Sequence, residues 1–427
     1  MTQDTDQTGA ATTRLTARGT STARQAPLGR VFWVVWWSST ISFIGDGVFY
    51  GAVPLLAASL TRDARLISLV DALTMSGWLC LCLVSGVAID RRRKTDVMWR
   101  VDAVRALIMV VFTALVVTGH GTIGAVLVVS FAIGLASPFF DNASSAVLPE
   151  IVERGSLEKA NSWNQSSLLL CANLVGPPVG AALFVWHSGL PLGIQAASFV
   201  GAALLVSRVA DAGHRPVADP SRSSTRELRE GLRYLWNHEL LRSLGLLLAV
   251  INGVTGGIVA IFVLFVLEVL VLPQAAYGWL VAAFAVGGLM GAYLAARVRA
   301  AVGVFGTVVG AALLFCLGAA LLGLCPVLPV VAVAIVITGL ASVLWNVVTV
   351  SLRQRIVPKE LLGRVTSVYR MVGMGASPIG ALGAGALAHA TSIQDAYTVG
   401  AVVLLVAVAA FTPGVRRGLA AQPAELI

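Results

Sequence analysis

Two aspartates stand inside long apolar stretches of the chain, where an ionised side chain is costly. Asp46 lies about 21 Å along a helix that begins near residue 31, counting 1.5 Å per residue, and is therefore near the middle of a bilayer. Asp141 lies in the fourth apolar stretch. A carboxyl group removed from water suits a site that takes up and releases protons. We expect Asp46 and Asp141 to bind protons, and the alternative is a carboxyl group hydrogen-bonded for structure or paired with a distant Arg.

A charged loop after the second apolar stretch holds another set of candidate residues. Its pattern, Gly-x-x-x-Asp-Arg-x-x-Lys, is made by Gly86, Asp90, Arg91 and Lys94. Asp102 and Arg105 follow on the next stretch at a spacing of three, so they share one face of a helix. This arrangement places two charged residues inside an apolar segment, where an unpaired ion is costly, and therefore indicates that Asp102 and Arg105 form an ion pair.

The elements that position these residues are membrane helices. Hydrophobic residues make up 57% of the 427 residues and charged residues only 12%, whereas soluble domains average about 25% charged residues. Because there are too few charged residues to form a water-exposed surface around so much apolar material, lipid must solvate much of the surface. We expect an all-α integral membrane protein.

Twelve apolar runs are long enough to cross about 30 Å of hydrocarbon. They lie near 31–60, 66–89, 97–118, 122–146, 162–186, 190–209, 241–270, 275–298, 302–324, 328–352, 364–388 and 396–413. An even number of spans puts both termini on one side. Of the 30 Lys and Arg residues, only Arg62 and Arg65 fall on the other side, and this bias predicts cytoplasmic termini. The net charge of +9 is thus explained by topology, and we expect no nucleic-acid partner.

An internal repeat relates the two halves of the chain. The segments that begin at Gly134 and Gly339 align without a gap over a fourth span, a loop and the start of a fifth span, and both open with Gly-Leu-Ala-Ser. This repeat predicts two pseudo-symmetric bundles of six helices. The predicted organisation is a disordered cytoplasmic tail (1–30), a first bundle (31–210), a cytoplasmic linker (211–240), a second bundle (241–415) and a second cytoplasmic tail (416–427).

The second part of the linker has the pattern of an amphipathic helix that begins at Ser224. Its apolar face holds Leu228, Leu232, Leu235 and Trp236, and its other face holds Arg226, Arg229 and Arg233. We expect it to lie in the plane of the lipid headgroups, with a soluble linker helix as the alternative.

The charged loop resembles the signature loop of the major facilitator superfamily. Asp102-x-x-Arg105-Ala106 and Gly45-Asp46-Gly47 are similar to the transmembrane secretion effector branch, which includes macrolide-efflux and siderophore-export proteins, and the resemblance covers residues 31–413. It implies a cytoplasmic gate, in which Asp90 meets the start of the eleventh span and neighbouring basic residues form a charge relay. The gate set is Gly86, Asp90, Arg91, Lys94, Asp102, Arg105, Arg364 and Arg370. Arg370 is either a relay partner or a side chain that reaches toward the membrane surface.

The fifth span contains Gly176, Pro177 and Gly180, which resemble a shortened form of the antiporter motif of this superfamily. Gly and Pro in membrane helices also serve only to bend them or to let neighbours approach, and this is the alternative. The fourth span has Ser-Pro-Phe-Phe-Asp-Asn where many drug/proton antiporters of the superfamily carry an Arg. The chain departs from those antiporters at that point.

Several aromatic and amide side chains in the spans are candidates for substrate contact, because cavities for amphiphiles are apolar with a few polar groups. They are Trp36, Phe49, Tyr50, Asn173, Asn252, Trp345, Asn346 and Tyr369. Asp71 and Glu268 lie near the outer ends of their spans and are expected to be wetted there.

The combined prediction is a secondary active transporter that exports an amphiphilic small molecule by alternating access, with proton antiport. The first alternative is a facilitator or proton symporter that imports a small metabolite. An integral-membrane enzyme is a remote alternative, because the five histidines have no metal-ligand spacing and no nucleotide-binding Gly-rich loop is found. We expect no metal and no cofactor. The partners expected are the substrate, protons and lipid, for a monomer in a bacterial inner membrane.

Overall fold

The computed structural model describes residues 28–90, 92–209 and 224–422. Within these ranges all regular structure is helical. The predicted N-terminal tail up to residue 27, the first part of the linker and the last five residues of the chain lie outside the described residues.

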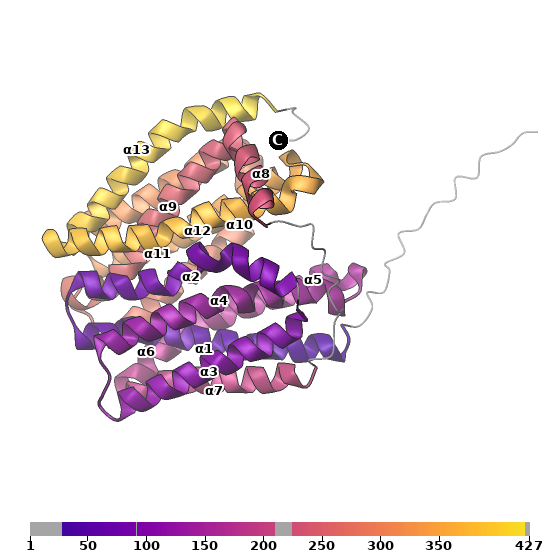
Figure 1. Cartoon of the computed structure of the whole chain (residues 1–427). Helices are drawn as coiled ribbons and strands as arrows, with labels where there is room; N and C mark the ends of the chain where they lie inside the picture. The colour runs from indigo at the N-terminus through magenta and orange to yellow at the C-terminus, as the bar shows by residue number, and fades with distance from the viewer. Residues whose placement is uncertain (1–27, 91, 210–223, 423–427) are drawn as a thin grey trace, which may run out of the picture.

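The helices follow one another with short connections. In chain order they are α1 (Arg30–Leu60), α2 (Ala64–Asp90), α3 (Lys94–Val117), α4 (Ile123–Ile151), the short η1 (Arg154–Ser156), α5 (Leu157–Ser167), η2 (Leu168–Val175), α6 (Gly176–Trp186), α7 (Gly189–Ser207), α8 (Ser224–Asn237), α9 (Glu239–Leu264), η3 (Phe265–Val269), α10 (Gln274–Leu324), α11 (Leu328–Ile356), α12 (Lys359–Ala390) and α13 (Ile393–Ala420). They lie side by side as two groups (Figure 1).

Twelve of these helical passages cross the bilayer. By length and hydropathy, 10 helices in the described part of the chain are long and apolar enough to span a membrane. One of them, α10, has 51 residues, or about 77 Å at 1.5 Å per residue, which is far too long for one crossing. It divides at Gly303, whose φ of 69° is a conformation that glycine adopts without steric cost. The twelfth crossing is α3, whose charges lower its hydropathy.

The fifth crossing is one continuous passage made of α5, η2 and α6. Pro177 and Pro178 have no N–H to donate, so the helix before them cannot keep its regular hydrogen bonds. The chain responds with a π-helical stretch, in which the Gly176 N–H donates to the Cys171 carbonyl five residues back. The sequence predicted this crossing but gave no sign of its π-helical middle.

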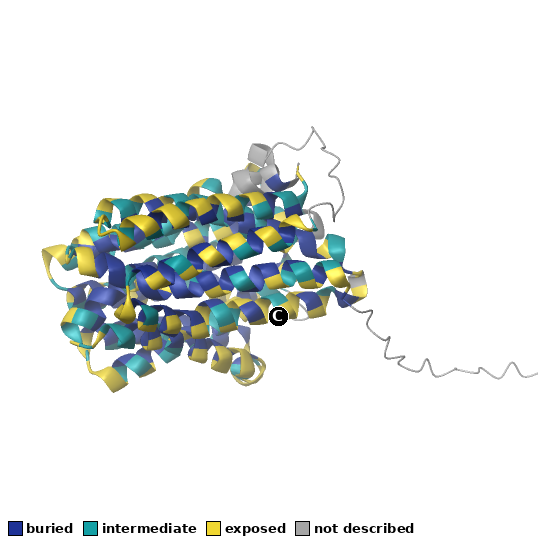
Figure 2. Ribbon diagram, turned by 90° about the horizontal axis from the view of Figure 1, so that it is seen from below, coloured by how far each residue is buried: buried dark blue, intermediate teal, exposed yellow. Residues whose placement is uncertain are grey.

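Apolar side chains lie on the outer faces of the bundles as well as on their inner faces. Buried residues form bands on the inner faces, and exposed residues lie on the outer faces of the peripheral helices (Figure 2). Many of the exposed residues are large and apolar, including Leu107, Val128, Ile379 and Val406. Large exposed apolar surfaces are rare on soluble monomers, and here they face lipid.

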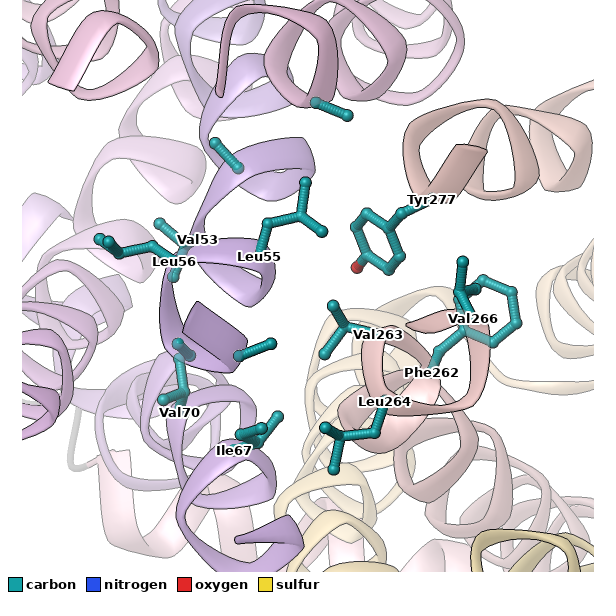
Figure 3. Close-up of a cluster of buried hydrophobic side chains, with 14 of the residues drawn as sticks. Val53, Leu55, Leu56, Ile67, Val70, Phe262, Val263, Leu264, Val266 and Tyr277 are labelled. Atoms are coloured by element: carbon teal, nitrogen blue, oxygen red, sulfur yellow. The ribbon is translucent and has the colours of Figure 1, made fainter. Parts of the chain in front are cut away.

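The two bundles share a core at one end only. We call the end where α1 begins and α13 stops the terminal side, and the opposite end, with residues 61–63, the far side. On the far side one cluster of buried residues contains side chains from both bundles. Leu55 of the first bundle and Val263 of the second, for example, lie close together in it (Figure 3). On the terminal side the second bundle has a core of its own, and so does the first. The bundles therefore meet on the far side.

The linker helix α8 begins at Ser224, as the sequence predicted, and packs against α12 and α9. Leu235 is buried against the second bundle, whereas Leu232 and Trp236 are exposed. The apolar face is thus divided between contact with protein and an outward surface. The last helix, α13, continues to Ala420, beyond the predicted start of the C-terminal tail at residue 416.

Candidate transport site

A cavity of about 450 Å³ lies between the two bundles. Residues of α1, α2, η2, α6, α9, α10 and α11 line it, and most of them are apolar. The polar side chains of the lining are Tyr50, Asp71, Thr74, Asn173, Thr255, Tyr277 and Thr338. An apolar cavity of this size with a few polar groups suits a drug-sized molecule.

The far side of the cavity is closed by apolar side chains from both bundles. Leu55 of α1 and Ile67 of α2 approach Val263 of α9 and Tyr277 of α10 (Figure 3). All four are at most 3% exposed. A polar or bulky molecule in the cavity has no route to the far side past this packed layer.

One ion pair and one histidine–carboxylate contact join the bundles at the far-side surface, outside this layer. An Arg62 guanidinium nitrogen lies 3.6 Å from a Glu268 carboxylate oxygen, and His389 Nδ1 lies 3.5 Å from Asp63 Oδ1. Hydrogen bonds from the Arg65 side chain and backbone N–H lower the pKa of Asp63 to about 2. Because these groups are exposed, each pair stabilises the closed far side only weakly.

A buried ion pair occupies the interior of the first bundle. Arg105 and Asp102 of α3 are 2% and 0% exposed, and an Arg105 guanidinium nitrogen lies 3.6 Å from Asp102 Oδ1. Arg105 also donates a hydrogen bond of 2.7 Å to the Ser137 hydroxyl of α4. Its guanidinium lies 5.2 Å from the ring centre of Phe140 and 5.1 Å from that of Phe199. The predicted pairing on one helix face is therefore present, and α4 and α7 enclose it.

Asp46 and Asp141, both half-buried, lie near this ion pair. Gln195 of α7 donates a hydrogen bond of 2.9 Å to Asp46 Oδ1. Asp46 interacts electrostatically with Arg105, as does Asp141, and Asp141 also interacts with Arg370 of the second bundle. The first bundle thus brings three carboxyl groups around one guanidinium.

Tyr50 connects this cluster with the cavity. It lies on α1 one turn beyond Asp46, lines the cavity and is 44% exposed. Its hydroxyl interacts electrostatically with Asp46, Asp141 and Arg105 of this cluster and also with Asp71. A change of charge in this cluster therefore changes the electrostatic environment of Tyr50 at the cavity wall.

The predicted antiporter-like motif packs directly against α1 beside Asp46. A Cβ atom added at Gly176 would lie 2.4 Å from Gly47 Cα, and one added at Gly180 would lie 2.1 Å from the Val48 carbonyl oxygen. Only glycine permits backbones to come this close. Pro177 lines the cavity. The motif therefore holds the segment of α1 that follows Asp46 in place.

Among the predicted gate residues, Lys94 and Arg364 lie on the terminal side, whereas Asp102 and Arg105 form the interior pair described above. Arg91, the side chain of Asp90 and the surroundings of Gly86 are outside the described part of the chain. Lys94 pairs with Glu150 of α4, within the first bundle. The other members of the set are located as follows: Arg364 of α12 pairs with Glu230 of α8, and the guanidinium of Arg370 lies 5.0 Å from the ring centre of Trp78 on α2.

The eight predicted substrate-contact residues are divided by the structure. Those that line the cavity are Phe49, Tyr50 and Asn173. Those outside its lining are Trp36, Asn252, Trp345, Asn346 and Tyr369. Trp36 belongs to an aromatic group with Trp33, Trp37 and Trp163 near the start of α1. Trp345 and Tyr369 are buried in the core of the second bundle.

Sequence reasoning missed two polar residues of the site. Gln195 is a single amide in the apolar run of α7, and only its burial at 1% exposure shows that it needs a partner inside the bundle. Asp71 was expected to be wetted at the outer end of its span, but it lines the central cavity. The position of both residues in long apolar runs was the available signal.

The fold and the site define a secondary transporter of the major facilitator kind, with two six-helix bundles around a central cavity. It is a transporter and not an enzyme. The chain belongs to the transmembrane secretion effector family, whose model matches residues 22–420.

Relatives of known function are efflux proteins. The chain is 28% identical over 399 residues to "Multidrug efflux pump Tap" of Mycobacterium tuberculosis, which covers 88% of this chain and 90% of that protein. It is 26% identical over 362 residues to "Macrolide efflux protein A" of Streptococcus pyogenes, covering 82% of this chain and 87% of that protein.

Solved structures share the fold. A bacterial homologue of the iron transporter ferroportin in its inward-facing state matches with a TM-score of 0.70 and 18% identity, over 92% of this chain and 99% of that one. The same kind of homologue in an outward-facing state gives a TM-score of 0.64 at 18% identity, over 92% and 100% of the two chains. At this identity the likeness establishes the major facilitator fold.

Proposed function

We propose that this protein exports an amphiphilic small molecule in exchange for protons, by alternating access of the central cavity to the two sides of the membrane. The observation that carries the proposal is the cluster of Asp46, Asp102, Asp141 and Arg105, in which the ion pair of Asp102 with Arg105 is buried and which lies near the cavity residue Tyr50. Membership of the secretion effector family and the efflux activity named for its relatives support export over import.

The charge balance of the cluster favours proton binding. Three carboxyl groups lie near Arg105, so full ionisation would leave two negative charges that this guanidinium does not balance, and the exposed Arg370 offsets only part of the charge of Asp141. Within the membrane such charges are costly, and proton binding would remove them. Asp102 has the ion pair with Arg105, which leaves Asp46 and Asp141 as the sites that we propose to load and unload protons.

Arg105 is positioned to respond when Asp46 and Asp141 gain or lose protons. Its Nε and Nη1 atoms have no hydrogen-bond partner, and neither has Asp102 Oδ1, so the hydrogen bonding of this pair is incomplete. Protonation of both Asp46 and Asp141 would leave the guanidinium with Asp102 as its remaining carboxylate partner in this cluster. Because α1 carries both Asp46 and Tyr50, we propose that this rearrangement reaches the cavity through α1.

We propose that the terminal side faces the bacterial cytoplasm. Arg62 and Arg65 are the basic residues assigned to the far side, and the excess on the terminal side supports this orientation. Since the bundles meet on the far side, the structure would then be closed to the outside. We propose the bundles at 31–210 and 241–415 as the moving bodies, and a monomer in the inner membrane as the working unit.

We further propose the terminal side as the site of the cytoplasmic gate. Lys94 and Arg364 are held by ion pairs that each stay within one half of the molecule, at the two helix starts that the gate would bring together. Asp90 would then meet the positive N-terminal end of α12 when the terminal side closes.

Uptake into inverted membrane vesicles with an acidic interior tests the proposal. A neutral dye, Nile red, and a cationic dye, ethidium, are followed together with internal pH. The Asp46→Asn variant should lose at least about 90% of the proton-driven uptake of any dye that the wild type transports. Asp395→Asn, a neutralisation at an exposed position at the start of α13, is the matched control and should transport normally. Undiminished proton-driven uptake by a stably expressed Asp46→Asn protein would refute the coupling role.

A further inference from the structure

We infer that the central cavity selects organic cations with an apolar body and that Asp71 is their counter-charge. This inference rests on the proposed function and specifies the substrate class. Asp71 of α2 is the acidic side chain among the residues that line the cavity, and none of the lining residues is Lys, Arg or His. The electrostatic character of this wall is therefore negative.

Asp71 is available to a ligand. Among the described residues it takes part in no hydrogen bond or ion pair, and its side chain is half-buried. The nearest basic residues in sequence, Arg62 and Arg65, are engaged with Glu268 and Asp63 at the far-side surface. A carboxylate without a partner in an apolar cavity is costly, so a ligand that carries a positive charge gains the stabilisation that the protein does not provide.

The rest of the lining also favours a cation. The aromatic side chains of the cavity wall are Phe49, Tyr50, Phe262, Tyr277 and Phe284. Ring faces attract organic cations, more strongly where water is excluded. Tyr50 and Tyr277 both interact electrostatically with Asp71, so two of these rings lie near the carboxyl group. Carboxylate and rings together form a site for a delocalised or tertiary ammonium cation.

The same features discriminate against other molecules. An organic anion would bring a second negative charge to the Asp71 carboxylate with no basic group to offset it. A neutral amphiphile would gain only from apolar contact with residues such as Val53 and Leu280. Selection by charge sign therefore depends on one residue.

Equilibrium binding of two ions of nearly equal shape tests this inference directly. Tetraphenylphosphonium and tetraphenylborate differ in the sign of their charge, and their binding to purified protein in nanodiscs is measured by calorimetry after subtraction of empty nanodiscs. The wild type should bind tetraphenylphosphonium at least about tenfold more tightly than tetraphenylborate. Asp71→Asn should lose at least about tenfold in affinity for the cation, whereas Asp71→Glu should keep most of it.

Asp395→Asn serves as the remote control and should bind like the wild type. Equal affinity of the wild type for both ions, or an unchanged affinity of Asp71→Asn for the cation, would overturn the inference. No proton gradient is present in this measurement, so failure of proton coupling cannot alter its result. Conversely, proton-driven uptake of the neutral dye alone would support the proposed function and contradict the cation site.

Discussion

Replacing Arg105 by Met should destabilise the first bundle mainly by leaving a charge behind. The Met side chain fills similar space but supplies no charge, so Asp102, which is 0% exposed, loses the partner at 3.6 Å. Breaking a buried pair on one side costs about 3–5 kcal/mol. The hydrogen bond from Arg105 to Ser137 contributes much less, because hydrogen bonds in membrane proteins average about 0.6 kcal/mol. The uncompensated carboxylate therefore dominates the expected loss.

Three variants separate these two contributions. Ser137→Ala should cost less than about 1 kcal/mol, whereas Arg105→Met should cost at least about 3 kcal/mol in the free energy of unfolding. The double variant Asp102→Asn/Arg105→Met removes both charges and should recover most of the loss. Unfolding of the purified protein in mixed micelles is followed by circular dichroism. If the double variant were no more stable than Arg105→Met, loss of packing would be the cause and the argument from charge would be wrong.

The remaining predictions concern a helix contact and a surface pair. Gly51→Val should destabilise the protein by about 1–3 kcal/mol, because a Cβ atom at residue 51 would lie 2.2 Å from a backbone oxygen of α6; an unchanged melting temperature would contradict this packing. Because hydrogen bonds from Arg65 lower the pKa of Asp63 to about 2, the stability that Asp63 contributes is present above the ordinary aspartate pKa and is lost as pH falls through about 2. The melting temperatures of Asp63→Asn and wild type should thus differ at pH 6 and converge near pH 2, and a constant difference would refute this.

The fold was largely predictable because membrane helices depend on a simple local property. About 20 apolar residues are needed to cross the bilayer, and backbone groups there must be satisfied within the helix. The run near 162–186 therefore marked a crossing whatever its details. Its π-helical middle, η2, depends on how Pro177 and the carbonyls before it share hydrogen bonds, and a hydropathy pattern contains no such information. Similarly, two adjacent runs predicted two crossings, but not that they meet at Gly303 with almost no loop.

The site was predictable only where its partners are close in sequence. Asp102 and Arg105 share a helix face at a spacing of three, so their pair followed from helix geometry. The partner of Asp46 is Gln195, 149 residues away, and only the packing of α1 against α7 brings them together. For Asp71, its distance from the start of the helix gave its position along the membrane normal. The sequence did not show that its side chain faces the cavity.

The internal repeat gives the two bundles the same fold, but their ionisable residues differ. Asp141 lies in the aligned segment, and its counterpart 205 residues later is Asn346. Asn346 keeps the shape of the carboxyl side chain but cannot carry a negative charge. The second bundle instead buries Arg353, whose guanidinium lies 3.8 Å from the ring centre of Tyr369. In the proposed mechanism, protonation changes the charge of the first bundle, whereas the second bundle contributes only uncharged residues to the cavity lining. This asymmetry would give a proton a defined bundle to act on.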